Sequence, residues 1–375
     1  MDLTQESKEW ISDICKKIVE KESRIIKNNG NKIPYTTING VFDDKFAEDP
    51  FWWTNGFWEG ILWLMRLKTG DPFYGELADG LEARMDAVLY DPEGLHHDVG
   101  FMWLLSSVAN YRITGSAASR KRGLAAANTL ASRYNPSAGF ITAWNGIDKE
   151  GWSIIDSMMN LPLLYWAGTE TGYQRYNEIA MAHADKTLDN AMRSDGSAIH
   201  IIEYDRSDGS VVRTLGGQGY GENSSWTRGQ GWALYGFIIS YLHTGVQKYL
   251  DAAKRAAHYF IAAVAPTGYV PPIDFRCPPE PSLVDTTAGG IAASGLIEIS
   301  KQCEYDGGMY LDAALKILKA IAEKYADWSD GCDAILRYGS EAYHSPAKRH
   351  IDIIYGDYFF IEALFKLGGL EFILW

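Results

Sequence analysis

The sequence has little cysteine, little positive charge and no long apolar run, and each shortage excludes a class of protein. The four cysteines among 375 residues lack the paired or metal-type spacing of a disulfide framework or a zinc site, so we expect reduced thiols in a cytoplasmic protein. A net charge of −13 disfavours nucleic acid as a partner, because phosphate binding requires a basic face. No segment has the uninterrupted apolar length of a membrane helix, and the first residues lack the basic and then apolar pattern of a secretory signal. We therefore expect no membrane partner.

Motifs for cofactors and for activated nucleophiles are also missing. The chain has no Gly-rich phosphate loop, no nucleophile elbow and no His, Asp and Glu residues at zinc-like spacing, so we expect no cofactor and no catalytic metal. His96, His97 and Asp98 are metal-ligand residue types, but neighbours at a helix start are expected to point in different directions. No linker or low-complexity run interrupts residues 1–375, which are predicted to form a single domain.

One kind of phrase occurs six times: a turn of aromatic and polar residues that leads into an apolar helix rich in Gly, Ala and Ser. The spacing of roughly 45 to 70 residues gives each unit room for two helices and a loop. Four of the apolar helices end in Thr-Gly, where glycine takes the left-handed conformation that stops a helix. A more polar stretch follows each, with apolar residues on one face only. The phrases are Trp53–Trp63, His96–Leu105, Ile154–Leu161, Ser225–Leu234, Asp285–Ala293 and Tyr355–Leu364.

Buried helices that alternate with half-exposed helices predict an all-α fold, an (α/α)6 barrel of six inner and six outer helices. The alternative is an open array of packed α-hairpins. The closed ring is favoured because the sixth phrase lies close to the C-terminus and leaves nothing to cap an open end. In a ring, the turn residues at the head of every inner helix face one pocket.

Several of the 13 tryptophans lie in these turns rather than inside helices. An indole beside polar groups can stack on the C–H-rich face of a sugar ring, whereas Trp63 and Trp166, in mid-helix, are expected in the core. The alternative, that the turn tryptophans are structural plugs, explains any one of them equally well but not all of them. The candidates for the pocket are Trp53, Trp58, Trp144, Trp226 and Trp232.

Two carboxylates are candidate catalytic groups. Asp98 and Asp156 open the second and third inner helices, so they occupy corresponding positions and face the same end of the ring. Either one alone could be a helix cap, but a converging pair is the arrangement used in glycoside chemistry. Asp156 stands between apolar neighbours, and both burial and a nearby carboxylate raise a carboxyl pKa. We therefore predict that Asp156 is a general acid.

Positive groups at helix heads are scarce. Arg228 is the strong candidate, because a guanidinium matches a carboxylate with two hydrogen bonds. His97 and His200 could donate hydrogen bonds to the same anion, and His200 is expected on a short strand or loop across the pocket. A histidine taken singly is more often a structural residue, so the pattern alone gives His200 only modest weight as a substrate contact.

The five phrases around Trp53, His96, Ile154, Ser225 and Gly356, in this order, resemble the unsaturated glucuronyl hydrolases of glycoside hydrolase family 88 over nearly the whole chain. Family 105, the unsaturated rhamnogalacturonyl hydrolases, shares the barrel and a similar Trp-x-Arg-Gly phrase. The His-His-Asp and Gly-Gln-Gly-Trp wording favours family 88. A sugar-binding barrel without catalytic activity is the alternative from another class.

The resemblance implies an unusual reaction on oligosaccharides left by polysaccharide lyases, whose terminal uronate has a C4–C5 double bond. Asp156 matches the acid/base that protonates C4 and activates water for attack at C5, and Asp98 matches the second carboxylate. The partner is then an unsaturated uronide oligosaccharide, and the protein is expected to be a monomer or weak homo-oligomer. Positions that match substrate contacts are His97, His200, Gln218, Trp226, Arg228 and Trp232, and Trp53 and Trp144 are added from the aromatic pattern.

One loop departs from the family pattern. Members that accept sulfated sugars carry Ser-x-x-Ser-x-Lys before the final Gly-Asp-Tyr phrase. This chain has Ser345, but Ala342 stands where the first serine would be and Lys348 comes one place late. We therefore expect Ser345 near the leaving-group sugar and a preference for unsulfated substrates.

Overall fold

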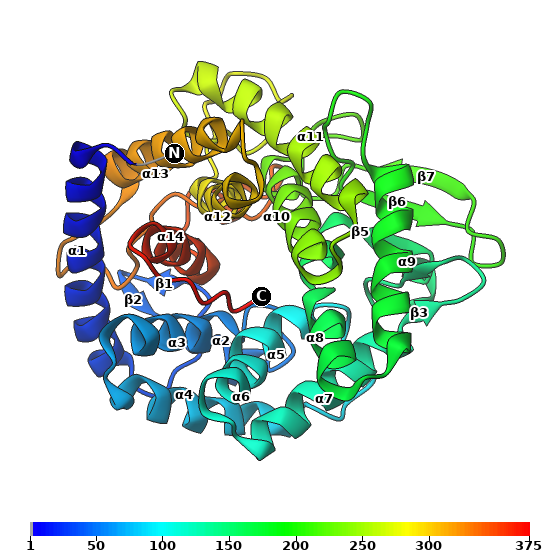
Figure 1. Cartoon of the computed structure of the whole chain (residues 1–375), viewed down its shortest axis with the longest axis horizontal. Coiled ribbons are helices and arrows are strands. Elements are labelled where there is room, and N and C mark those ends of the chain that lie inside the picture. Colours follow the sequence, from blue (N-terminus) through cyan, green and yellow to red (C-terminus); the bar gives the residue numbers. More distant parts are fainter. Residues whose placement is uncertain (1–2) are drawn as a thin grey trace.

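The computed structural model describes residues 3–375, in which helices form two concentric rings (Figure 1). The inner ring contains helices that are buried nearly all round, as the apolar phrases predict. Its second member is interrupted by a π-helical segment, η2, a feature that is frequent near functional sites. The inner helices are α3 (Phe57–Thr69), α5 (Val99–Trp103) with η2 (Leu104–Val108) and α6 (Ala109–Thr114), α8 (Pro162–Thr171), α10 (Thr227–Thr244), α12 (Thr286–Gln302) and α14 (Ile354–Leu367).

The outer ring consists of amphipathic helices, each buried along one face only. Four of them follow the Thr-Gly stops directly, and the stopping glycines have φ values between 68° and 80°, which confirms the predicted left-handed helix ends. The outer helices are α1 (Gln5–Asn29), α4 (Pro72–Arg84), α7 (Ala117–Ser132), α9 (Gln174–Ala191), α11 (Gln247–Val264) and α13 (Gly307–Tyr325).

The ring is closed by the two ends of the described chain. Helix α14 packs against α3, so the last inner helix contacts the first, and α1 covers α14 from outside (Figure 1). The sequence predicted a barrel in which each inner helix is followed by its outer partner. The sixth pair instead joins α14 to the helix at the other end of the chain. The (α/α)6 barrel is confirmed, with this difference in how its last unit is made.

Short strands accompany the helices of the barrel, and only the one near His200 was considered from the sequence. β1 (Thr37–Ile38) pairs with β2 (Val41–Phe42), and β3 (Tyr134–Asn135) with β4 (Phe140–Ile141). A three-stranded antiparallel sheet has the order β5 (Trp152–Ile154), β6 (Ile201–Tyr204), β7 (Val211–Leu215), with Ile154 opposite Ile201. Because β5 leads into the 3-10 turn η4 (Ile155–Met159) and β6 starts directly after His200, this register brings Asp156 and His200 to the same end of the barrel.

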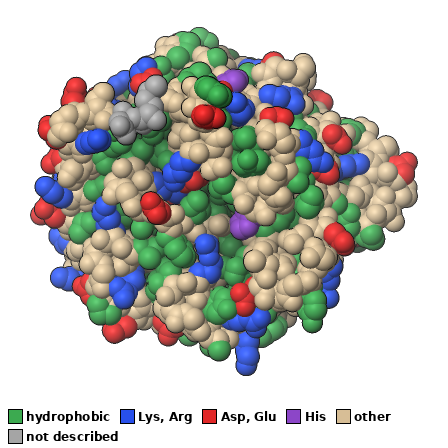
Figure 2. All heavy atoms as spheres, in the orientation of Figure 1, with side chains coloured by type: hydrophobic (Ala, Val, Ile, Leu, Met, Phe, Trp, Pro, Cys, Tyr) green, Lys and Arg blue, Asp and Glu red, His purple; other side chains and the backbone are tan. Residues whose placement is uncertain are grey.

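The remaining elements are short. Helix α2 (Lys45–Glu48) precedes the first aromatic turn, and 3-10 turns occur at η1 (Met85–Ala87), η3 (Ile147–Lys149), η5 (Ala265–Thr267) and η6 (Pro346–Lys348). Within residues 3–375, no helix combines the length and the apolar character that crossing a membrane requires. On the face shown in Figure 2, charged side chains of both signs surround a central area where hydrophobic side chains gather.

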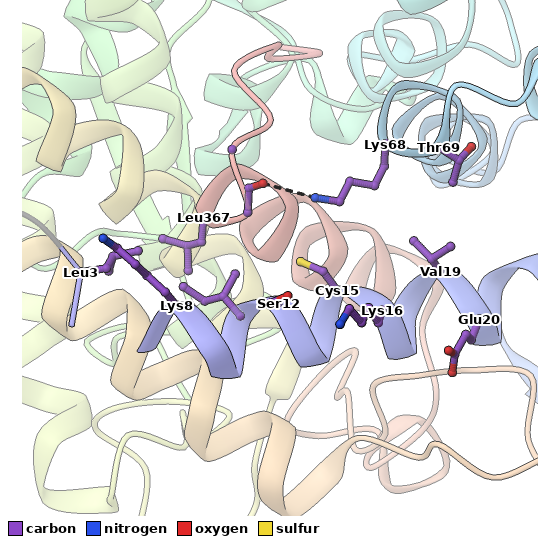
Figure 3. Close-up of a pocket in the computed structure, with 13 residues that line it drawn as sticks. Leu3, Lys8, Ser12, Cys15, Lys16, Val19, Glu20, Lys68, Thr69 and Leu367 are labelled. Carbon is purple, nitrogen blue, oxygen red and sulfur yellow. Dashed lines mark hydrogen bonds between the residues drawn. The ribbon is translucent and has the colours of Figure 1, made fainter. Parts of the chain in front are cut away.

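A hollow of about 760 Å³ lies outside the inner ring, where α1 passes the ends of α3 and α14 (Figure 3). It is lined by apolar side chains and by the charged residues Lys8, Lys16, Glu20 and Lys68, and Lys68 Nζ donates a hydrogen bond to the Gly368 carbonyl. None of the predicted site residues contributes to it. The sequence-predicted chemistry lies elsewhere, at the heads of the inner helices.

Candidate active site

A cleft of about 480 Å³ lies where the heads of the inner helices converge, a volume typical of small-molecule sites. Eight of the residues predicted from the sequence line it: Trp53, Asp98, Trp144, Asp156, Gln218, Trp226, Arg228 and Trp232. His97 and His200 are buried behind this lining, and Ser345 lies outside it on a partly exposed loop. The expected ring of helix-head residues around one pocket is therefore present.

Asp98 directly precedes α5 but does not cap it. Its carboxylate instead accepts a hydrogen bond from Asn160 Nδ2 at 3.0 Å, and its Oδ2 lies 3.2 Å from His96 Nδ1 and 3.3 Å from His97 Nε2. Burial alone would raise the pKa of Asp98, but the two imidazoles hold that pKa below its ordinary value. Asp98 is thus an ionised carboxylate at neutral pH.

Asp156 has the opposite properties. It lies in η4, its side chain is 17% exposed, and its Oδ1 accepts no hydrogen bond from any described residue. Burial raises the pKa of Asp156 to about 7, and the negative charge of Asp98 adds to this effect while His97 and Arg228 oppose it. This agrees with the direction expected from its apolar neighbours. Asp156 can therefore hold a proton near neutral pH and face the cleft with it.

His97 connects the two carboxyl groups. The imidazole is fully buried, with Nδ1 2.8 Å from Ser157 Oγ and Nε2 3.9 Å from Asp156 Oδ1. Burial lowers the pKa of His97, but the neighbouring charges of Asp98 and Asp156 outweigh it and leave the pKa raised. The two carboxyl groups therefore favour the protonated form of His97, which is buried beside them and is not exposed to the substrate.

The expectation that His96, His97 and Asp98 point in different directions is wrong. One ligand-type atom from each lies within 4.8 Å of the others. The cause is local, since Asp98 has φ −73° and ψ 7° and the chain turns tightly here before α5 begins. Imidazole and carboxylate groups can ligate zinc, so the absence of a catalytic metal stays a prediction. In this structure both imidazoles lie beside the Asp98 carboxylate and lower its pKa.

Arg228 lines the cleft but does not offer a free guanidinium. Its side chain is 1% exposed, and Nη1 pairs with the buried Asp285 Oδ2 at 3.1 Å. Nη1 also donates to the Ser340 carbonyl and Nη2 to the Glu341 carbonyl. The guanidinium further lies over the ring of Trp226, 4.7 Å from its centroid. The sequence indicated a cation ready to grip a carboxylate with two hydrogen bonds, whereas the folded chain already uses both terminal nitrogens.

His200 supports the cleft from behind. The sequence predicted a short strand or loop here, and His200 is the loop residue directly before β6; its ring centroid lies 4.1 Å from that of Trp226. Its Nδ1 is within hydrogen-bond distance of the Gly216 carbonyl and of the Gln218 backbone N–H. Burial lowers the pKa of His200 to about 3, so the ring is neutral. It holds the Trp226 indole and does not bring a positive charge.

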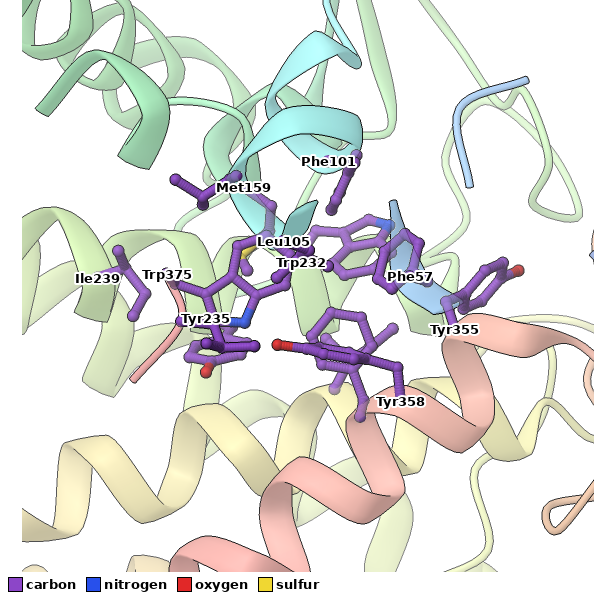
Figure 4. Close-up of a cluster of buried hydrophobic side chains, with 14 of the residues drawn as sticks. Phe57, Phe101, Leu105, Met159, Trp232, Tyr235, Ile239, Tyr355, Tyr358 and Trp375 are labelled. Carbon is purple, nitrogen blue, oxygen red and sulfur yellow. The ribbon is translucent and has the colours of Figure 1, made fainter. Parts of the chain in front are cut away.

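The aromatic floor of the cleft continues into the barrel core (Figure 4). Phe101 lies beneath it, with ring centroids 5.2 Å from Trp53 and 5.3 Å from Trp232. Trp375, near the centre of the barrel, contacts the same cluster at 5.9 Å from Phe101. The prediction that Trp58 belongs to the pocket is wrong. Trp58 is fully buried and does not line the cleft, because it lies inside α3 rather than in the turn before it.

Sequence reasoning missed five residues that line the cleft: Asp49, Phe51, Trp52, His96 and Glu341. The run of aromatic residues before Trp53 could have indicated two of these, Phe51 and Trp52. Glu341 had no such signal, because it lies in the loop before α14 and reaches the cleft only in the folded chain. Its carboxylate accepts a hydrogen bond from Tyr35 and pairs with Lys348 Nζ at 2.7 Å, while its carbonyl accepts from Gln218 Nε2.

No protein-family model matches the chain, but individual proteins do. The unsaturated glucuronyl hydrolase of Bacillus sp. strain GL1 is 37% identical over 354 residues, which is 92% of this chain and 93% of that protein. An unsaturated chondroitin disaccharide hydrolase from Streptococcus pneumoniae is 33% identical over 324 residues, 84% of this chain and 81% of that protein.

Solved structures of unsaturated glucuronyl hydrolases also match this chain. The crystal structure of the Bacillus sp. GL1 unsaturated glucuronyl hydrolase matches with a TM-score of 0.86 at 36% identity, covering 94% of this chain and 95% of that one. An Asp-to-Asn variant of the Streptococcus agalactiae enzyme, complexed with dGlcA-GalNAc6S, gives a TM-score of 0.84 at 27% identity and covers 98% and 94%. Identity that extends over nearly the whole length, together with the same helical barrel, places this chain in the family of unsaturated glucuronyl hydrolases, which are glycoside hydrolases.

Proposed function

We propose that this enzyme removes the 4,5-unsaturated uronic acid from the non-reducing end of lyase-generated oligosaccharides by hydrating its C4–C5 double bond. The observation that carries the proposal is the unequal pair of carboxyl groups in one cleft. Asp156 has a pKa of about 7 and Asp98 has a pKa below its ordinary value. Two carboxyl groups whose pKa values are driven apart supply an acid and a stabilising anion at the same pH.

The chemistry begins with the proton on Asp156. The Asp156 side chain lines the cleft and is 17% exposed, so its carboxyl group can approach a substrate carbon. Proton transfer to C4 leaves positive charge at C5, shared with the ring oxygen. The resulting Asp156 carboxylate then takes a proton from water, which forms a bond to C5. The acid and the base are thus one residue in two successive states.

The product of this hydration is a hemiketal at C5. It opens by breaking the bond between C5 and the ring oxygen, which leaves a ketone at C5 and a hemiacetal at C1. The hemiacetal then expels the second sugar and becomes an aldehyde. No bond forms between enzyme and sugar, and C1 is never attacked. The carboxyl separation that predicts retention or inversion in other glycosidases therefore has no bearing here.

Asp98 stabilises the transition state by charge. As positive charge develops at C5, the fixed negative charge of the Asp98 carboxylate on the cleft wall stabilises it without needing to reorganise. Its partners Asn160, His96 and His97 keep the oxygen atoms in place. The raised pKa of His97 also favours a positively charged imidazole beside Asp156, and this charge offsets the negative charge that remains after proton transfer.

Substrate binding is proposed to rest on the aromatic walls. Trp53, Trp144, Trp226 and Trp232 line the cleft, and the buried indole N–H of Trp226 has no partner among residues 3–375. Because this nitrogen is buried, the indole is proposed to act by stacking on the sugar ring rather than by donating a hydrogen bond. We propose that Arg228 contributes its electrostatic field more than direct contacts, since its terminal nitrogens are already bonded.

The names of the relatives favour glycosaminoglycan-type uronides over rhamnogalacturonan fragments. They include unsaturated glucuronyl and unsaturated chondroitin disaccharide hydrolases, and one matched structure is described as specific for heparin. For this chain we propose unsulfated substrates, because Lys348 is paired with Glu341 and Ala342 has no hydrogen-bonding side chain. Residues 1–375 are proposed to act as one catalytic domain, with Ser345 beside the leaving sugar.

The test is direct. Purified enzyme is mixed with unsaturated disaccharides from hyaluronate, chondroitin and heparin lyases and with an unsaturated rhamnogalacturonan disaccharide. Loss of the ultraviolet absorbance of the double bond, together with release of the reducing sugar, supports the proposal. Binding of these sugars without any loss of absorbance would make the chain a sugar-binding barrel instead. Turnover of the rhamnogalacturonan disaccharide alone would correct the substrate class.

A further inference from the structure

Asn160 lies at the end of the turn that carries Asp156, yet it contacts the other carboxylate. We propose that Asn160 is a positioning residue that keeps Asp98 ionised and fixed relative to Asp156. The inference rests on the proposed function, because it assigns Asn160 a part in the same reaction. Asn160 is fully buried and does not line the cleft, so it acts through Asp98 rather than on the substrate.

The Asn160 amide joins the two carboxyl-bearing segments. Its Nδ2 donates to Asp98 Oδ1 at 3.0 Å and to the backbone carbonyl of Asp156 at 3.3 Å. Its Oδ1 accepts the backbone N–H of Phe101 at 2.8 Å, in the first turn of α5. One side chain thus holds η4 against the start of α5. The relative position of Asp98 and Asp156 depends on this contact.

The orientation of the amide is determined by its partners. Turning it over would place the amide NH2 against the Phe101 N–H and the amide oxygen against the Asp98 carboxylate, so both contacts would become repulsive. Close packing also requires Gly100, because a Cβ there would lie 2.4 Å from Asn160 Oδ1 and 2.5 Å from its Cα. The glycine lets α5 approach closely enough for the amide to reach both partners.

A hydrogen bond donated to a carboxylate favours its ionised form. Loss of the Asn160 donor should therefore make Asp98 easier to protonate. A protonated Asp98 would no longer stabilise the positive charge at C5. Without its negative charge it would also no longer help to raise the pKa of Asp156. Loss of the Asn160 contact would therefore disturb both the position and the charge of Asp98. We expect this to lower the rate of the chemical step and to leave substrate binding nearly unchanged.

Asn160→Asp is the sharpest variant, because it keeps the volume and the acceptor for Phe101 but replaces the donor to Asp98 with an oxygen. We expect kcat to fall by roughly 10- to 100-fold, the scale of a misplaced catalytic group, with KM changed by less than about threefold. A new carboxyl group beside Asp98 raises the pKa of Asp98, so the acidic limb of the kcat profile should move up by about one pH unit or more.

Ser106→Ala is the matched control. Ser106 is fully buried in the same barrel unit and donates to the Met102 carbonyl, but it contacts neither carboxylate. We expect unchanged kcat and an unchanged pH profile for it. Asn160→Ala serves as a second variant if Asn160→Asp does not fold, and it should shift the acidic limb in the same direction. A folded Asn160 variant with the kcat and acidic limb of the unaltered enzyme overturns the proposal.

A readout without substrate separates this inference from the proposed function. In protein with carbon-13 in its aspartate carboxyl groups, the Asp98 signal, assigned by its loss in Asp98→Asn, should titrate at a higher pH in either Asn160 variant. An unmoved titration overturns the positioning role whatever the enzyme turns over. Failure of the unaltered enzyme to consume any unsaturated uronide would instead overturn the proposed function.

Discussion

Asp98 and Asp156 face the same imidazole nitrogen, with His97 Nε2 3.3 Å from Asp98 Oδ2 and 3.9 Å from Asp156 Oδ1. The shared neighbour does not make the two carboxyl groups alike. Asp98 also has Asn160 and His96 as partners, whereas the Asp156 oxygen has no hydrogen-bond partner among residues 3–375. The difference in partners is what separates an ionised carboxylate from a protonated one.

Asp156→Asn should remove most turnover and leave substrate affinity nearly unchanged. The asparagine keeps the shape of the side chain but cannot deliver a proton, and positioned acid/base groups contribute about 10²- to 10⁴-fold. The measurement is kcat and KM on an unsaturated disaccharide, with circular dichroism as the check on folding. Retention of more than about a tenth of the original rate, well outside that range, would show that another group is the acid.

The same substitution should stabilise the fold at high pH. The pKa of Asp156 is raised from 3.8 to about 7 in the folded protein, so this group costs stability as the pH rises through that window and most above it. Thermal melts at pH 4 and pH 8 check the sign. Asp156→Asn should raise Tm relative to the unaltered enzyme at pH 8 and change it much less at pH 4. A lower Tm at pH 8 would mean that the carboxylate has a stabilising partner.

The pH profile of kcat should fall on its alkaline side near pH 7. Above that pH Asp156 loses the proton that it must transfer, while Asp98, whose pKa is lowered, stays ionised there and becomes protonated only on the acidic limb of the profile. Initial rates between pH 4 and pH 9 on an unsulfated unsaturated disaccharide measure this. Constant kcat up to pH 9 would exclude Asp156 as the proton donor.

Arg228→Ala should lower both kcat/KM and stability. The cleft loses its buried cation in a chain of net charge −13, and Asp285 is left buried without its counter-ion. Removing one partner of such a pair costs about 2–5 kcal/mol. Arg228→Lys, which keeps the charge but not the fork of hydrogen bonds, is the comparison. Unaltered kcat/KM in a folded Arg228→Ala enzyme would restrict the residue to a structural role.

Unsulfated unsaturated chondroitin disaccharide should be cleaved faster than its 6-sulfated form. Lys348 is paired with Glu341, and Ala342 offers no hydrogen bond, so a sulfate would lose water without gaining its donors. Each unmet buried polar group forfeits about 1–3 kcal/mol, which corresponds to roughly tenfold or more in kcat/KM. Glu341→Gln removes the carboxylate that pairs with Lys348, so it should reduce the ratio of kcat/KM for the unsulfated disaccharide to kcat/KM for the 6-sulfated one. Equal rates for the two disaccharides in the unaltered enzyme would contradict this interpretation of the loop.

Local patterns were sufficient to predict the barrel. Thr-Gly stops, helices that are apolar all round and stretches with one apolar face each report on a few neighbouring residues, and the structure confirms them at Gly70, Gly115, Gly172 and Gly245. Asp98 directly precedes α5 as predicted, whereas Asp156 does not open α8 but lies in the 3-10 turn η4 ahead of it. In a closed ring, equivalent positions face one end, so helix boundaries were enough to bring the two carboxyl groups together.

The sequence could not show which side chains are partners across the ring. Asp285 neutralises Arg228 from 57 residues away, Glu341 ties Gln218 and Lys348 to one wall of the cleft, and α1 covers α14 from the opposite end of the chain. Each contact depends on how loops from separate units pack, which no local periodicity encodes. Burial decided the rest, because the pKa values that distinguish Asp156 from Asp98 depend on the surroundings that only the folded chain provides.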